Sequence, residues 1–215
     1  MKKSSILFLA VSLQTGAIFC QSQVYDDFKG NKALHYGEKT GKLDTLAENP
    51  EMNSVNNTKK CAKYVRNGEK KFDVIKMNLS GSFSDSSINT YATYLGIPPK
   101  LKMKVYTTAP AGTLVEILLG RKSGNNDFPA GVNSQYQAHT TISNGWEELE
   151  FKFSQIPKGS ETSASQIDQL TVLFNPNSMT SDTYYFADIT GPMLTPLKKQ
   201  TTNPTSSTMN RGNKK

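Results

Sequence analysis

The chain has 215 residues, of which 36% are hydrophobic, and this suits one domain with a single buried core. Its formal net charge of +7 comes from the two ends, Lys2 and Lys3 at one and residues 198–215 at the other, because all 18 acidic residues lie between Asp26 and Asp188. The middle of the chain is therefore close to neutral. A basic face for nucleic acid is not expected.

The first 22 residues predict a secretory signal peptide. Lys2 and Lys3 form its charged start, and residues 6–19 are mostly apolar but too few to span a bilayer. Residues 20–22 (CQS) supply small side chains for a cleavage after Ser22. We expect a protein that is secreted or displayed at the cell surface; an N-terminal anchor is the alternative. No later stretch of the sequence is apolar enough to span a membrane.

Removal of the signal leaves Cys61 as the one cysteine of the mature chain, so no internal disulfide is expected. Two roles are open to this residue. It is either a small buried hydrophobic side chain or a reactive thiol.

Short alternating segments separated by Gly, Pro and Asn turns dominate the remainder of the chain. Residues 60–66 and 72–79 predict a hairpin across Asn67-Gly68, and residues 87–95 are the one candidate for an amphipathic helix. The further expected strands are 101–106, 113–120, 135–142, 146–153, 167–174 and 183–189. This pattern predicts an all-β fold, a two-sheet antiparallel β-sandwich (jelly roll), over residues 23–194. The polar and basic tail, 195–215, has too little apolar surface to fold and is expected to be disordered.

The strand at 146–153 places Leu149, Phe151 and Phe153 on one face, and Glu148 and Glu150 on the other. Two carboxyls about 7 Å apart on one strand face are within the range that glycosidases use. A solvated face with alternating charge has the same pattern, since the next outward residue is a lysine. No metal-binding, phosphate-binding or nucleophile motif accompanies the pair, so the chain is not expected to be an enzyme.

Three segments in order along the chain carry a resemblance to a known family. They are residues 24–28 (VYDDF), 146–149 (WEEL) and 184–189 (YYFADI). Together they resemble the β-jelly-roll carbohydrate-binding modules of the galactose-binding-like group, as found in secreted proteins of Bacteroidetes-type bacteria. The resemblance covers residues 25–190. It implies a ligand on the concave face of a sheet or at the loop end.

Several modules of that group hold a structural calcium ion near the first and last strands. The resemblance implies Asp27 and Asp188 as its ligands here, although Lys29 and Ala187 stand where many members have acidic residues. Carbonyl groups and water would have to complete the six to eight oxygens that calcium takes. The alternative is that both aspartates cap strand ends or pair with lysines.

Sugars bind to aromatic rings through their C–H surfaces and to planar polar groups through their hydroxyls. We expect such ligand contacts from one polar sheet face and the loop beside it, comprising Tyr106, Glu116, Gln137, His139 and Arg121. Trp146 either packs structurally or forms a stacking platform for the sugar.

The sequence therefore predicts a secreted, non-catalytic carbohydrate-binding domain that holds a polysaccharide or a surface glycan. The alternative is a secreted structural or adhesive β-sandwich with a protein or cell-wall partner and no sugar site.

Overall fold

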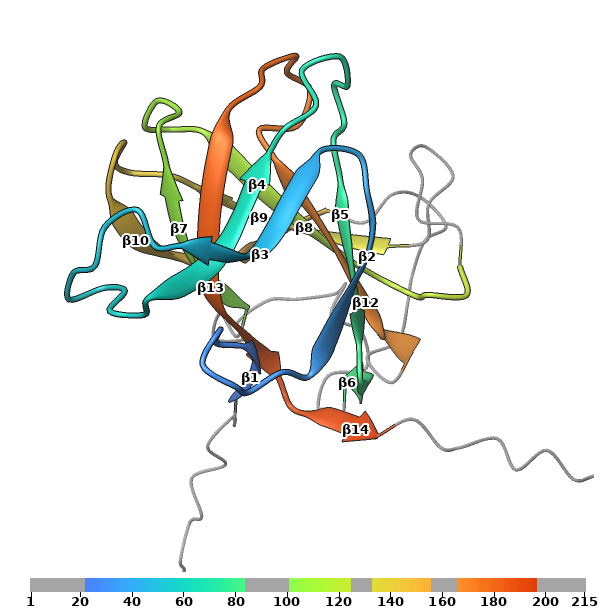
Figure 1. Cartoon of the computed structure of the whole chain (residues 1–215). Coiled ribbons are helices and arrows are strands. Elements are labelled where there is room, and N and C mark those ends of the chain that lie inside the picture. The colour runs from blue at the N-terminus through green and yellow to red at the C-terminus, as the bar shows by residue number, and fades with distance from the viewer. Residues whose placement is uncertain (1–21, 84–100, 125–132, 156–165, 197–215) are drawn as a thin grey trace, which may run out of the picture.

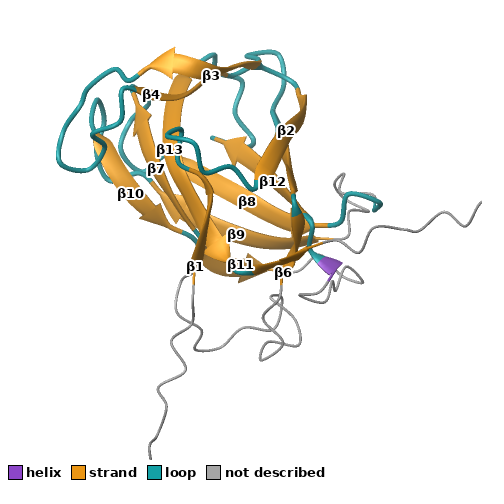
Figure 2. Ribbon diagram, turned by 60° about the horizontal axis from the view of Figure 1, so that its bottom comes forward, coloured by secondary structure: helices purple, strands orange, loops and turns teal. Residues whose placement is uncertain are grey.

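A computed structural model of the chain describes residues 22–83, 101–124, 133–155 and 166–196. Two six-stranded antiparallel sheets pack against each other (Figure 1), and Figure 2 shows that strands make up most of the described chain. The sequence prediction of a two-sheet antiparallel β-sandwich is confirmed. Within the described residues, no helix is both long and apolar enough to cross a membrane.

The strands of each sheet come from distant parts of the sequence. In spatial order, sheet A consists of β10 (Trp146–Glu150), β7 (Lys102–Thr107), β13 (Thr183–Pro192), β4 (Lys60–Val65) and β3 (Lys42–Glu48), and β1 (Ser22–Asp26) also pairs with β13. Sheet B consists of β11 (Lys152–Gln155), β9 (Asn133–His139), β8 (Leu114–Gly120), β12 (Gln169–Phe174), β5 (Ile75–Leu79) and β2 (Leu34–Lys39). A small third sheet pairs β6 (Gly81–Phe83) with β14 (Leu194–Pro196).

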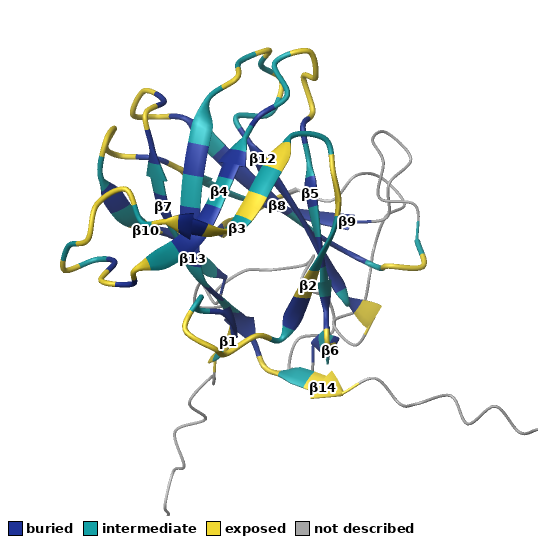
Figure 3. Ribbon diagram, in the orientation of Figure 1, coloured by how far each residue is buried: buried dark blue, intermediate teal, exposed yellow. Residues whose placement is uncertain are grey.

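The core lies between the two sheets, because each strand turns its alternate apolar side chains inward. Val115, Ile117 and Leu119 of β8 are buried there, and Figure 3 shows the buried positions alternating along the strands. Phe174 of β12 stacks on Tyr184 of β13, with their ring centroids 4.4 Å apart, and so joins sheet B to sheet A. The outward positions of the same strands are left to form the two outer faces.

The predicted hairpin of residues 60–66 and 72–79 is wrong, because β4 belongs to sheet A and β5 to sheet B. The connection between them crosses from one sheet to the other and holds a buried ion pair. The Arg66 and Asp73 side chains are fully buried, with Nε and Oδ2 4.0 Å apart. Alternating residues fit a strand in either sheet, so the sequence pattern does not reveal this crossing.

Hydrogen bonds satisfy most of the polar atoms of this buried ion pair. Arg66 donates to the Ser178 and Thr180 hydroxyls, while Asp73 accepts from the Tyr64 hydroxyl at 2.7 Å and from the Asn67 amide at 2.8 Å. Burial, and then Asp73, raise the pKa of Tyr64 well above its usual value. The pair thereby fixes the loops that precede β5 and β13. Removing either partner would leave a buried charge without its counter-charge, which is strongly unfavourable.

The expected strand 146–153 is two strands. β10 pairs with β7 in sheet A and β11 pairs with β9 in sheet B, so the chain turns the corner of the sandwich at Phe151. The predicted facing is nevertheless confirmed, since Leu149, Phe151 and Phe153 all contact the core.

Several sequence predictions fall on parts of the chain that lie outside the described residues. These are the signal peptide up to residue 21, the helix at 87–95 and the tail beyond residue 196. The strands β1, β2 and β3 were not expected, because β1 has only five residues and charged residues interrupt the apolar alternation of β2 and β3.

Candidate functional site

The outer face of sheet B carries polar side chains in rows that cross its strands. One row runs from His35 on β2 through Asn78 on β5 to Gln169 on β12, where the Gln169 amide donates to the Asn78 side-chain oxygen at 2.7 Å. A second row joins Glu116 on β8, Gln137 on β9 and Lys152 on β11, and the buried Leu173 on β12 continues it as an apolar side chain. These planar amide and carboxylate groups are of the kind that bind sugar hydroxyls.

Glu116 is the central acidic group of this face. Its side chain accepts a hydrogen bond from the Gln137 amide at 2.6 Å, and the residue is only 9% exposed. Burial raises the pKa of the Glu116 carboxyl, and the bond from Gln137 opposes that shift. A carboxylate poor in water contacts gains from any further hydroxyl donor that a ligand supplies.

Glu116 and Gln137 are neighbours across β8 and β9, and His139 lies on the same face. His139 lies opposite Leu114 at one end of β8 and is exposed. Arg121 follows Gly120 at the other end of that strand, about 23 Å away at 3.3 Å per residue. A single sugar residue cannot reach both, so Arg121 is separate from this group.

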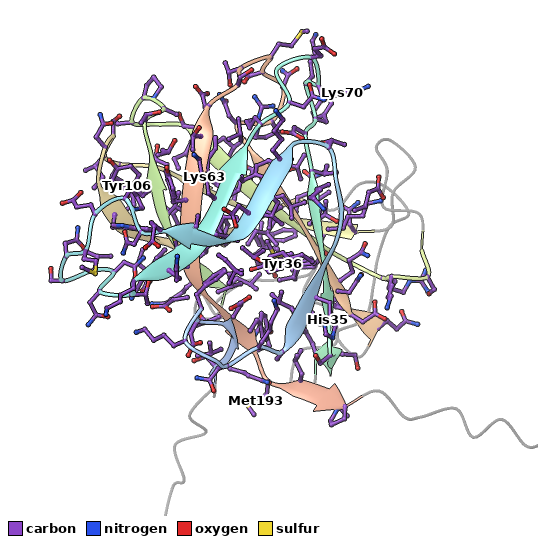
Figure 4. The ribbon with its side chains drawn as sticks, in the orientation of Figure 1. His35, Tyr36, Lys63, Lys70, Tyr106 and Met193 are labelled. Carbon is purple, nitrogen blue, oxygen red and sulfur yellow. The ribbon has the colours of Figure 1, made fainter. Side chains whose placement is uncertain are left out.

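Tyr106 does not share this face, and the prediction that it does is wrong. It lies on β7 in sheet A, with its side chain on the opposite side of the sandwich (Figure 4). The alternation along its strand makes Tyr106 outward facing, like Glu116 and Gln137. However, the alternation within one strand does not tell which sheet that strand joins.

Trp146 packs next to Tyr106 on the outer side of sheet A, with 5.9 Å between ring centroids. It is 2% exposed, and its indole N–H donates to the side-chain oxygen of Asn49 at 2.9 Å. This geometry agrees with structural packing rather than with a stacking platform, because a sugar cannot reach a buried ring.

Glu148 and Glu150 lie together on the outer face of sheet A, as the sequence predicted. Both pair with Lys102, at 3.0 Å and 2.6 Å. The Lys102 ammonium donates hydrogen bonds to Glu150 and Glu148, and these bonds raise its pKa. The two carboxylates thus share one cation on a solvated face, which is the alternative to a glycosidase pair.

Asp27 and Asp188 already have partners in the protein. Asp27 accepts from the backbone amides of Lys29 and Asn31 and from the Asn31 side chain, and such bonds lower its pKa against the effect of burial. Asp188 pairs with Lys104 at 2.5 Å. No group of three or more His, Cys, Asp and Glu that could hold a metal ion occurs among the described residues. Donors of the protein engage both aspartates, and the calcium site stays a prediction.

Cys61 is buried beside Trp146 and Ala187 under the outer side of sheet A. Burial, and then Asp44 and Glu48, raise the pKa of its thiol to about 11. This is the environment of an inert packing residue, because the thiolate is the reactive form.

Sequence reasoning missed Asn78 and Gln169 on sheet B, and Lys63 and Tyr185 on sheet A. Lys63 lies over the Tyr185 ring, with Nζ 5.7 Å from the centroid. Period-two alternation could have marked these four residues as outward facing. It could not have paired them, because their strands are distant in the sequence.

No family model matches the chain, and no curated protein matches its sequence. Similar folds occur among solved structures. An α-L-arabinofuranosidase with bound arabinose is 13% identical with a TM-score of 0.51, and the match covers 79% of this chain and 27% of that one. An exo-β-agarase is 8% identical with a TM-score of 0.49, covering 80% and 25% of the two chains.

A family 11 carbohydrate-binding module from Clostridium thermocellum, in complex with a β-1,3-1,4-mixed-linked tetrasaccharide, is also similar. It is 11% identical with a TM-score of 0.45, and the match covers 82% of this chain and 98% of that one. The present chain spans about a quarter of the length of the two enzymes. Identities this low concern the fold alone, the two-sheet β-sandwich.

Proposed function

We propose that the chain is a secreted, non-catalytic carbohydrate-binding domain that holds a polysaccharide or surface glycan on the outer face of sheet B. The observation that carries the proposal is the cross-strand pair of Glu116 and Gln137, a poorly hydrated carboxylate bonded to an amide. Such paired planar groups bind adjacent hydroxyls of a sugar through directed hydrogen bonds.

The neighbouring side chains support the same ligand chemistry. His35 and Asn78 lie in the parallel row, and Asn78 bonds to Gln169. Lys152 is opposite Gln137, so the charge of Glu116 has a cation in its own row. Lys76 pairs with Glu38 at 2.7 Å on this face, so its acidic and basic groups balance, and this favours a neutral glycan over an ionic polymer.

The resemblance of three sequence segments to jelly-roll carbohydrate-binding modules supports the proposal independently of this face. The non-catalytic part of the proposal rests on the engagement of Glu148 and Glu150 by Lys102. Secretion rests on the N-terminal signal predicted from residues 1–22.

The test is retention of the purified protein on a panel of insoluble and immobilised glycans. We expect retention on one glycan class. Glu116→Ala should weaken it about ten- to a hundred-fold, because a hydrogen bond to a charged group contributes about 1.5–3 kcal/mol. Glu148→Ala is the matched control, since it removes a glutamate from the other sheet. A folded protein that no glycan retains would overturn the proposal and favour the structural or adhesive sandwich.

A further inference from the structure

A row of side chains crosses the outer face of sheet A on strands β4, β13, β7 and β10. Strand register places Lys63 opposite Tyr185, Tyr185 opposite Tyr106, and Tyr106 opposite Trp146. The Tyr185 and Tyr106 ring centroids are 5.8 Å apart. We call Lys63, Tyr185 and Tyr106 the tyrosine row, which the face proposed above does not include.

The tyrosine row is held by a small core beneath it. Trp146, Cys61 and Ala187 are buried there, and Tyr106 and Tyr185 pack against them while remaining partly exposed. The bond from Trp146 to Asn49 anchors the end of the row. Because the rings are already fixed, a ligand that contacts them orders few side chains on binding.

The two phenol rings meet at 86°, so they form a corner and not a flat platform. Within the described part of the chain, neither phenol hydroxyl makes a hydrogen bond, and neither is buried. A corner of two rings with two available hydroxyls suits one pyranose ring better than a long, flat polysaccharide surface.

Lys63 differs in its charge partners from Lys102 and Lys104 on the same face. Lys102 pairs with Glu148 and Glu150, and Lys104 pairs with Asp188. Lys63 makes no ion pair with any residue that the structure describes, and its ammonium lies over the Tyr185 ring.

Asp44 is the register partner of Lys63 on β3. Its Oδ1 accepts the amide of Leu46 in its own bulge at 2.9 Å, and no ion pair joins its carboxylate to Lys63 in the described part of the chain. A cation beside aromatic rings, with no carboxylate bound, is complementary to an anionic ligand that also has a C–H surface.

We propose that the tyrosine row is a second saccharide site that binds an acidic sugar residue, a uronate. The C–H surface of the sugar packs against the phenol rings, and its carboxylate pairs with the Lys63 ammonium. The inference rests on sheet A alone and does not depend on glycan binding at Glu116.

Trp146, the single tryptophan of the sequence, reports on this site because its ring lies 5.9 Å from Tyr106. The full chain is titrated with a trimer of galacturonic acid, and separately with a trimer of galactose, while tryptophan fluorescence is followed. We expect a saturable change with the acidic trimer and at least tenfold weaker binding of the neutral one. Equal binding of the two trimers, or binding of neither, overturns the proposal.

Substitutions in the tyrosine row test whether the acidic trimer binds there. Lys63→Met and Tyr185→Ala should each weaken binding of the acidic trimer at least tenfold, with circular dichroism to confirm that both remain folded. Lys63→Met also tests the site if Tyr185→Ala does not fold. Lys102→Met is the matched control, because it removes a lysine from the same face. An equal loss in Lys63→Met and Lys102→Met shows diffuse charge attraction and overturns the site.

Glu116→Gln separates this inference from the function proposed above. It should leave binding of the acidic trimer unchanged, since Glu116 lies on the other sheet. Loss of that binding in Glu116→Gln would move the acidic sugar to sheet B and overturn the second site.

Discussion

The two outer faces of the sandwich come from the same period-two alternation, yet they differ in how their polar groups are satisfied. On sheet A, Lys102 and Lys104 pair with acidic residues and surround a tyrosine row over a buried tryptophan. On sheet B, the Gln137 amide donates to the Glu116 carboxylate, and the Gln169 amide donates to the side-chain oxygen of Asn78. Surface ion pairs contribute little by themselves, so the tyrosine row gives sheet A its capacity for a ligand, whereas poorly hydrated amide and carboxylate groups give sheet B its own.

Both faces depend on the buried connection between the sheets, and breaking it should have the largest effect. Asp73→Ala leaves Arg66 buried without its counter-charge and removes the shorter of the two hydrogen bonds that the Tyr64 hydroxyl donates. We expect a loss of about 3–5 kcal/mol in the free energy of unfolding, measured by urea denaturation.

Lys102→Ala is the control for this prediction, because its ion pairs are at the surface and should contribute less than about 1 kcal/mol. Similar losses in the two variants would contradict the assigned role of the Arg66–Asp73 pair.

Trp146→Phe tests whether the faces are independent. It keeps a ring in the small core but removes the bond to Asn49, and the unfolding free energy should fall by about 1–2 kcal/mol. Glycan retention through sheet B should not change. A variant that loses glycan retention while staying folded would assign Trp146 to the glycan site after all.

The sequence predicts which way a side chain faces, but it does not predict which sheet its strand joins. Alternation predicted that Leu149, Phe151 and Phe153 face the core and that Glu116 and Gln137 face outward, because side-chain direction is a local property of a strand. Which sheet a strand joins depends on the path of the connections. This is why Tyr106 was placed on the wrong face.

The same limit applies to the Arg66–Asp73 pair and to the bond between Asn78 and Gln169. Arg66 bonds to Ser178 and Thr180, more than a hundred residues along the chain, and Asn78 bonds to a residue 91 positions away. Composition and spacing hold no signal for contacts that only the folded topology creates.

The buried carboxyl of Glu116 on sheet B should make the free energy of unfolding depend on pH, unlike the exposed glutamates of sheet A. Its pKa is higher in the folded state than the 4.5 of an exposed glutamate, mainly because of burial. The folded protein therefore retains this proton at pH values where the unfolded chain has lost it. Relative to Glu116→Gln, the wild type should lose stability as the pH rises from 4.5 through the raised pKa, and then level off.

Urea denaturation of the two proteins at a series of pH values measures this difference, with Glu148→Gln as the matched control on sheet A. A wild type that gains stability over Glu116→Gln as the pH rises would contradict the buried environment assigned to Glu116.

The smallest expected effect is that of calcium. Asp27 already accepts three N–H groups and Asp188 already holds Lys104, so calcium would have to displace these partners before it gained their oxygens. We expect the same Tm, by differential scanning calorimetry, with calcium and with chelator. A rise in Tm that Asp27→Asn abolishes would instead establish the structural calcium site that the sequence resemblance implies, because a ligand that binds only the folded state stabilises it.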